Sequence, residues 1–78
     1  RKKHGKSLAQ AEADRLLRVI RVIERATAAF ESREKAMRWL RKPKRRLDGR
    51  SPMEVLGADA GMTEIINWLD RIDYGIAA

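Results

Sequence analysis

Two prolines divide this chain more sharply than any other feature of its sequence. Pro43 has no backbone N–H to donate and disfavours a helical conformation at Lys42, so the helix before it is predicted to end there. Pro52 has the opposite role. It lies between Ser51 and Glu54 in the pattern of a capping box with proline at the first helical position, so a new helix is predicted to begin at Pro52.

The segment between these two helix boundaries is predicted to keep one fixed shape. Asp48 and Gly49 mark a turn within it, because aspartate and glycine both tolerate the backbone conformations that turns require. A segment with a defined boundary at each end can serve as a recognition surface. The basic residues in or beside it are candidate electrostatic contacts: Arg41, Lys42, Lys44, Arg45 and Arg46.

The spacing of the apolar residues predicts an all-α fold, a small bundle of about four helices. The first is long and amphipathic and is expected over residues 8–30. The apolar side that we expect to face inward contains Leu16, Val19, Ile20, Ile23, Ala26 and Phe30. The charged side that we expect to face solvent contains Asp14, Arg18, Arg21 and Arg25. No segment shows the strict alternation of a strand.

Two short helices are predicted on either side of the segment between the prolines. Ser32 can cap the first by accepting a hydrogen bond from a backbone N–H. The residues expected to face inward from it are Ala36, Met37 and Leu40, with Trp39 alongside. The other short helix starts at Pro52 and is expected to end by Gly57, after about two turns.

A fourth helix of medium length is predicted at the C-terminal end, with Asp59 as its cap. Tyr74 and Gly75 are expected to close it, with glycine in the left-handed conformation. Its apolar side is expected to contain Met62, Ile65, Ile66, Leu69 and Ile72, and its solvated side Glu64, Asp70 and Arg71.

Composition limits where the protein works. The chain has no cysteine and no apolar run near the roughly 18 residues of a membrane span, so we expect a cytoplasmic location and no membrane partner. Residues 1–7 are charged and contain no apolar side chain, and we expect them to form a linker or disordered basic leader before a helical domain over residues 8–78. Because the sequence starts at Arg1, we expect an upstream region to be missing.

The net charge of +7 is unevenly distributed. Residues 33–50 contain nine Lys or Arg and two acids, whereas residues 51–78 contain one Arg and five acids. A basic block of this kind can bind nucleic acid by releasing counterions from phosphates, bind an acidic protein, or simply be a solvated face. Charge alone leaves all three open.

Few residues could support catalysis or hold a metal ion. His4, the single histidine, lies beside Lys3 and Lys6, which repel cations. Asp70 and Asp73 could share a cation, but a solvated acidic face explains their spacing better. We therefore predict that the chain is not an enzyme and that it has no catalytic residue, no metal and no cofactor.

Trp39 and Trp68 fit two roles. In so small a domain their burial would contribute heavily to a marginal core. One of them could instead be an exposed anchor for a partner, since tryptophan is enriched at interface hot spots. Beyond Trp39 no aromatic residue is interleaved with basic residues 41–46, which argues against the stacking platforms that single-stranded nucleic acid requires.

From Ala36 onward, the sequence AMRWLRKPKRRLDGRSPMEVL, then Gly61 and INWLDRIDYG, resembles the C-terminal toxin-binding domain of the Xre/MbcA/ParS antitoxins. The positions that carry the family pattern are Ala36, Trp39, Leu40, Pro43, Leu47, Gly49, Pro52, Leu56, Gly61, Leu69, Ile72 and Gly75. Residues 8–30 also look like the helix that precedes this domain in the family. The run from Lys44 to Arg46 is more basic than the family pattern, and we expect it to tune the fit to one toxin.

The resemblance implies an antitoxin of a bacterial type II system, whose toxin has the RES fold and attacks NAD by phosphorolysis, hydrolysis or ADP-ribosyl transfer. It implies that the antitoxin packs over the NAD cleft of the toxin. Promoter binding and self-association would belong to an upstream helix-turn-helix region that is not recognisable here. The expected toxin-binding residues are Leu47, Asp48, Gly49, Arg50, Ser51, Pro52, Arg71, Asp73, Tyr74, Gly75 and Ile76. The expected core or structural residues are Trp39, Leu40, Leu56, Gly61, Ile65, Leu69 and Ile72.

A second hypothesis from the residues is a basic helical module that binds nucleic acid. The steep salt dependence of phosphate contacts separates it from a protein inhibitor, because the logarithm of affinity falls by nearly one unit of slope for each phosphate neutralised.

Overall fold

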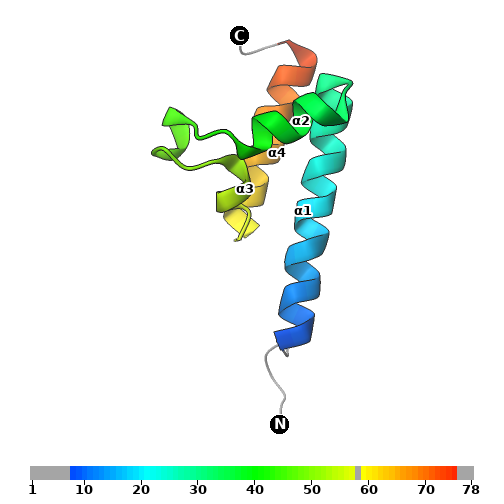
Figure 1. The fold of residues 1–78 in the computed structure, drawn as a ribbon, viewed down its shortest axis with the longest axis vertical. Coiled ribbons are helices and arrows are strands. Elements are labelled where there is room, and N and C mark those ends of the chain that lie inside the picture. The colour runs from blue at the N-terminus through cyan, green and yellow to red at the C-terminus, as the bar shows by residue number, and fades with distance from the viewer. Residues whose placement is uncertain (1–7, 58, 76–78) are drawn as a thin grey trace.

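The computed structural model of the chain describes residues 8–57 and 59–75, and it confirms the predicted all-α class (Figure 1). The elements in chain order are α1 (Leu8–Phe30), α2 (Arg33–Arg41), the single-turn 3-10 helix η1 (Arg45–Leu47), α3 (Pro52–Val55) and α4 (Asp59–Tyr74). Within these described ranges the extended backbone pairing is limited to one isolated antiparallel bridge, between Lys44 and Arg50. No helix of the described residues is long and apolar enough to cross a membrane.

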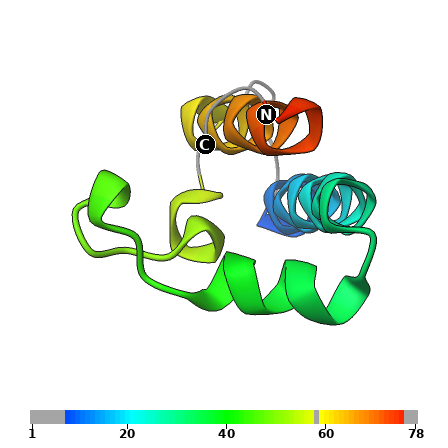
Figure 2. The same cartoon turned by 90° about the horizontal axis from the view of Figure 1, so that it is seen from above.

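The helices form a small bundle from which two segments project. Helices α1 and α4 lie side by side and run in the same direction, and α2 crosses one side of the pair (Figures 1 and 2). The first half of α1 extends past the other helices, and the segment between α2 and α3 projects from the body (Figure 1). The buried apolar side chains come from α1, α2, η1 and α4 and from the residue that ends α3: Val22, Ala26, Ala36, Leu40, Leu47, Leu56, Ile65 and Leu69.

The predicted helix boundaries are confirmed where the structure describes them, except that α3 has four residues, about one turn in place of the predicted two. The Ser32 hydroxyl accepts a hydrogen bond from the backbone N–H of Lys35 at 3.1 Å, and α2 ends just before Lys42. At the start of α3 both halves of the capping box are present, each at 3.2 Å, between Ser51 and Glu54. Helix α4 begins at Asp59 itself, whose side chain, with residue 58, lies outside the described part of the chain.

The predicted inward side of α1 is partly wrong. Leu16 and Ile20 are 59% and 41% exposed, whereas Val22, which was not predicted to face inward, is fully buried beside Ala26. The first half of α1 extends beyond α2 and α4, so an apolar residue there, such as Leu16, lacks a helix to pack against (Figure 1). Ile20 lies within the packed half, but Val19, Val22 and Ile23 face the core there and Ile20 does not. Helical periodicity identifies an apolar stripe, but it does not say how far the neighbouring helices reach along it.

Two arginines expected to face solvent from α1 instead bind neighbouring elements. Arg18 donates hydrogen bonds to the backbone carbonyls of Leu56 at 3.3 Å and Gly57 at 3.2 Å, which end α3. Arg25 binds carboxylates of α4. Both residues border the buried side of the helix, and a long side chain can cover apolar surface while its guanidinium reaches a polar partner.

Gly61 allows α4 to pass close to α3, because a Cβ at this position would overlap the backbone carbonyl oxygen of Val55. We predict that Gly61→Ala lowers the free energy of unfolding by about 1–3 kcal/mol, the usual cost of overpacking. Alanine is otherwise the better helix former by about 1 kcal/mol, so a net loss reports the overlap. Urea denaturation followed by tryptophan fluorescence measures it.

The matched control is Gly57→Ala, whose added Cβ would meet only the end of the Arg15 side chain, at 3.6 Å. We expect its free energy of unfolding to stay within about 0.5 kcal/mol of the parent. Equal losses in the two variants would contradict the close approach at Gly61.

Candidate functional site

The segment between α2 and α3 forms a closed turn, which we call the basic loop (residues 44–50). Its ends are joined by the Lys44 to Arg50 bridge, in which the Lys44 N–H donates to the Arg50 carbonyl at 2.9 Å. The Gly49 N–H donates back to the Lys44 carbonyl, also at 2.9 Å. Asp48 and Gly49 have φ angles of 60° and 84°, which confirms the predicted turn. The sequence did not predict the bridge or the 3-10 turn η1.

Buried residues anchor the middle of the basic loop and the segment that follows it. Leu47 is 5% exposed and packs in the core, and Ser51 and Pro52 are also buried. These three predicted toxin-binding residues therefore face the interior of the domain. Asp48 and Gly49 are exposed at the tip, and Arg50 is exposed at the C-terminal end of the loop. The structure thus separates the candidate loop residues into anchors and surface residues.

Two tryptophans contact basic side chains of the basic loop. The Trp39 and Trp68 rings meet edge to face, with centroids 5.0 Å apart, and both side chains are half-buried. The Lys44 ammonium lies 4.8 Å from the centroid of the Trp39 ring, and the Arg46 guanidinium lies 4.7 Å from that of Trp68. We call these four residues the tryptophan platform. The tryptophans therefore pack on the core and also hold two cations.

Sequence reasoning missed the tryptophan platform. Arg46 and Trp68 are 22 positions apart, so no local spacing connects them, and only tertiary packing brings η1 to α4. Burial lowers the pKa of Lys44 below its ordinary value, and the charge of Lys42 lowers it further. Lys44 is therefore held against Trp39 at some cost in hydration, which limits its freedom to pair with other groups.

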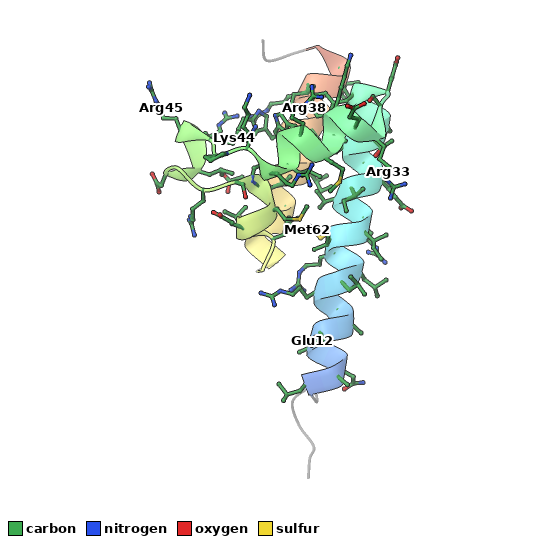
Figure 3. The ribbon with its side chains drawn as sticks, viewed as in Figure 1. Glu12, Arg33, Arg38, Lys44, Arg45 and Met62 are labelled. Carbon is green, nitrogen blue, oxygen red and sulfur yellow. The ribbon has the colours of Figure 1, made fainter. Side chains whose placement is uncertain are left out.

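The remaining basic residues are available for contacts. Arg41, Lys42 and Arg45 are exposed, and Figure 3 shows Arg45 pointing away from the body of the domain. Within the described ranges, no ion pair is formed by the Arg45 side chain. These three cations can attract an acidic partner without first leaving an aromatic ring.

A cleft of about 520 Å³ separates the basic loop from α3 and the start of α4. Its lining residues are Arg46, Leu47, Asp48, Arg50, Glu54, Val55, Gly57, Gly61 and Glu64. Because carboxylates contribute to this lining together with the two arginines, the cleft does not present the uniformly basic wall that a polyanion requires.

The end of α4 is the other candidate contact region. Tyr74 is 71% exposed, and Arg71 is also exposed. Gly75 ends the helix with a φ of 69°, and its N–H donates to the Ile72 carbonyl at 3.2 Å, as the sequence predicted. Asp73 differs from this group because its carboxylate binds Arg25 at 2.9 Å. Ile76 lies outside the described residues.

The described residues contain no group of three or more potential metal ligands. Asp70 and Asp73, the pair considered for a shared cation, instead share the guanidinium of Arg25. His4 lies outside the described part of the chain. The carboxylate pair therefore has an internal partner, and its spacing reflects neither a metal site nor a plain solvated face.

The fold and this site together define a small helical module that presents an ordered basic loop and an exposed helix end. A family model described as the antitoxin Xre/MbcA/ParS C-terminal toxin-binding domain matches residues 25–75. The match covers more than half of the chain, and the chain belongs to this family.

Three curated relatives carry the name antitoxin Xre. The protein from Pseudomonas putida is 41% identical over 64 residues, which cover 82% of this chain and 40% of the relative. The one from Photorhabdus laumondii is 31% identical over 68 residues, or 86% and 46%. The one from Yersinia enterocolitica is 29% identical over 77 residues, or 97% and 52%. The chain spans about half the length of these relatives, and no solved structure matches it.

The tryptophan platform predicts different roles for two neighbouring arginines. Replacing Arg46 with alanine removes a cation from the Trp68 face, and we expect the free energy of unfolding to fall by about 0.5–1 kcal/mol. Arg45→Ala is the matched control and should change it by less than about 0.5 kcal/mol. Urea titration of both variants decides this; a larger loss for Arg45→Ala would contradict the platform.

Proposed function

We propose that this chain is the toxin-binding part of a type II antitoxin, and that it binds a RES-fold toxin and covers the NAD-binding cleft of that toxin. The family assignment over residues 25–75 supports the first half of this proposal, since its description names toxin binding. The claim that the partner is a RES-fold toxin whose NAD-binding cleft is covered rests on the resemblance and on how the exposed residues are arranged. In this role the chain blocks an active site and contributes no chemistry of its own.

One contact supports the proposal that a single partner touches both candidate contact regions. Arg46 of the basic loop lies over Trp68 of α4. Arg71 follows Trp68 at an interval of three residues, which puts it on the same side of the helix. The basic loop and the last turn of α4 therefore border one side of α4, and a single partner can contact both.

The exposed residues of the basic loop and of the end of α4 are the proposed contacts: Asp48, Gly49, Arg50, Arg71, Tyr74 and Gly75, with Arg41, Lys42 and Arg45 as electrostatic contacts. Tyr74 is the expected anchor, because an exposed tyrosine offers a large contact area at low cost in side-chain entropy. The three cations are expected to act mainly on the association rate by steering an acidic partner.

The nucleic-acid alternative has less support from the geometry. Lys44 and Arg46 are held on the tryptophans, and the cleft beside them contains three carboxylates. Helix α3 has four residues, too few to lie along a major groove as a recognition helix. A protein partner is therefore the better fit to this surface.

The direct test is capture of the partner from the native cell followed by an assay of its chemistry. The captured protein should consume NAD once it is released from this chain and should be inactive while bound. A captured protein that leaves NAD unchanged after release would contradict the proposal. So would tight binding of this chain to duplex DNA, with an affinity that falls steeply with salt.

The turn at the tip of the basic loop can be tested separately. A Cβ at Gly49 meets no atom within 4 Å, so a substitution there acts through the positive φ angle and not through a clash. We predict that Gly49→Val weakens binding of the captured toxin by about 1 kcal/mol or more. Gly49→Asn is the control and should bind nearly as well as the parent, because asparagine tolerates the left-handed conformation. Equal affinity for all three chains would remove the tip from the interface.

The C-terminal contact predicts that binding and inhibition can be separated. Ending the chain after Asp73 removes the exposed Tyr74 and everything that follows it. The basic loop remains, so we expect binding to persist with some loss, while NAD turnover by the saturated complex returns. The assay uses the truncated chain well above its own dissociation constant. A saturated complex that stays inactive would place the block in the loop or in the body of α4.

A further inference from the structure

One guanidinium ties the end of α4 to α1. Nε of Arg25 donates to Oδ1 of Asp70 at 2.9 Å, and Nη2 lies 2.8 Å from the same oxygen. The same Nη2 donates to Oδ2 of Asp73 at 2.9 Å. The Arg25 side chain is only 24% exposed, so these contacts are partly shielded from solvent. We call these three residues the arginine clamp.

The position of the two carboxylates makes the arginine clamp necessary. The C-terminal end of a helix carries partial negative charge, so Asp70 and Asp73 destabilise the last turns of α4 by their location. They are three residues apart and repel each other. The hydrogen bond from Arg25 to Asp73, and to a smaller extent the one to Asp70, raise the pKa of the guanidinium above its ordinary value. Arg25 thus supplies the cation that offsets both unfavourable effects.

Apolar packing alone holds this end of α4 weakly. Leu69 is fully buried, but after it only Ile72 packs against the core among the described residues, and Ile72 is half-buried. Tyr74 and Gly75 follow on the exposed end. The direction in which Tyr74 points therefore depends on whether the turn that contains Asp70 and Asp73 stays helical.

We propose that Arg25 is a positioning residue for toxin binding: through Asp70 and Asp73 it keeps the last turn of α4 helical and so presents Tyr74 to the toxin. This inference rests on the proposed function. It adds to the contact residues a residue of α1 that is far from them in the sequence. Arg25 acts on affinity through Tyr74, and its own contacts are internal.

The first test uses the free chain. Arg25→Gln should speed amide hydrogen exchange at residues 71–75 by about tenfold, which corresponds to losing two partly exposed ion pairs. Exchange at Leu40 and Ile65 in the core should remain slow, which would show that the domain remains folded. Arg21→Gln is the matched control from the same helix, and it should leave both sets of amides as they are. Unchanged exchange at residues 71–75 in Arg25→Gln would overturn the inference without involving any toxin.

The second test measures coupling to Tyr74. Arg25→Gln and Tyr74→Ala should each weaken binding of the captured toxin, by about tenfold for Arg25→Gln. If Arg25 acts through Tyr74, the double variant should bind no more weakly than Tyr74→Ala alone, whereas independent effects would multiply. Multiplied losses would overturn the inference and leave the proposed function standing. If the parent chain itself binds no NAD-consuming protein, the proposed function fails, and the inference fails with it.

A rescue variant keeps the test informative if Arg25→Gln loosens the whole domain. Neutralising the carboxylates as well, with Asp70→Asn and Asp73→Asn in the Arg25→Gln background, removes both the repulsion and the unfavourable charge at the helix end. We expect this triple variant to recover most of the parent's toxin affinity and its slow exchange at residues 71–75. A triple variant as weak as Arg25→Gln would contradict positioning by charge.

Discussion

The edge-to-face contact between Trp39 and Trp68 is the interaction on which the candidate site depends. It joins α2 to α4 at the place where the chain leaves α2 for the basic loop. Each ring then offers its outer face to a cation of that loop, Lys44 or Arg46. The same two side chains therefore stabilise the core and fix the loop. In a domain this small the core is marginal, so one contact that serves both purposes contributes a large share of the stability.

The parts of the structure that the sequence predicts are those set by local backbone chemistry. Pro43, the capping box at Ser51 and the left-handed Gly75 each act within a few residues, and each is found as expected. Some local features, the Lys44 to Arg50 bridge and η1, were not predicted, and the other contacts that it did not predict depend mostly on residues far apart in the chain. The cation over Trp68 and the ion pairs of Arg25 both arise from tertiary packing.

The candidate site shows the same division. Sequence reasoning selected the loop and the helix end. It could not separate the buried Leu47, Ser51 and Pro52 from the exposed tip at Gly49. Burial depends on the direction of each side chain in the folded domain, which local sequence does not give. It also grouped Asp73 with the contact residues, whereas the structure places its carboxylate on Arg25. Exposed candidate contact residues and the buried or ion-paired residues that anchor them therefore alternate along the basic loop and the end of α4.

We propose that this domain excludes NAD from the toxin by covering its cleft. Calorimetric titration of NAD into the captured toxin, alone and saturated with this chain, tests that claim most directly, because it measures occupancy of the cleft without relying on turnover. The account predicts that the free toxin binds NAD and that the saturated complex binds none over the same concentration range. NAD binding to the complex with unchanged affinity would contradict it and would show that inhibition leaves the cleft open.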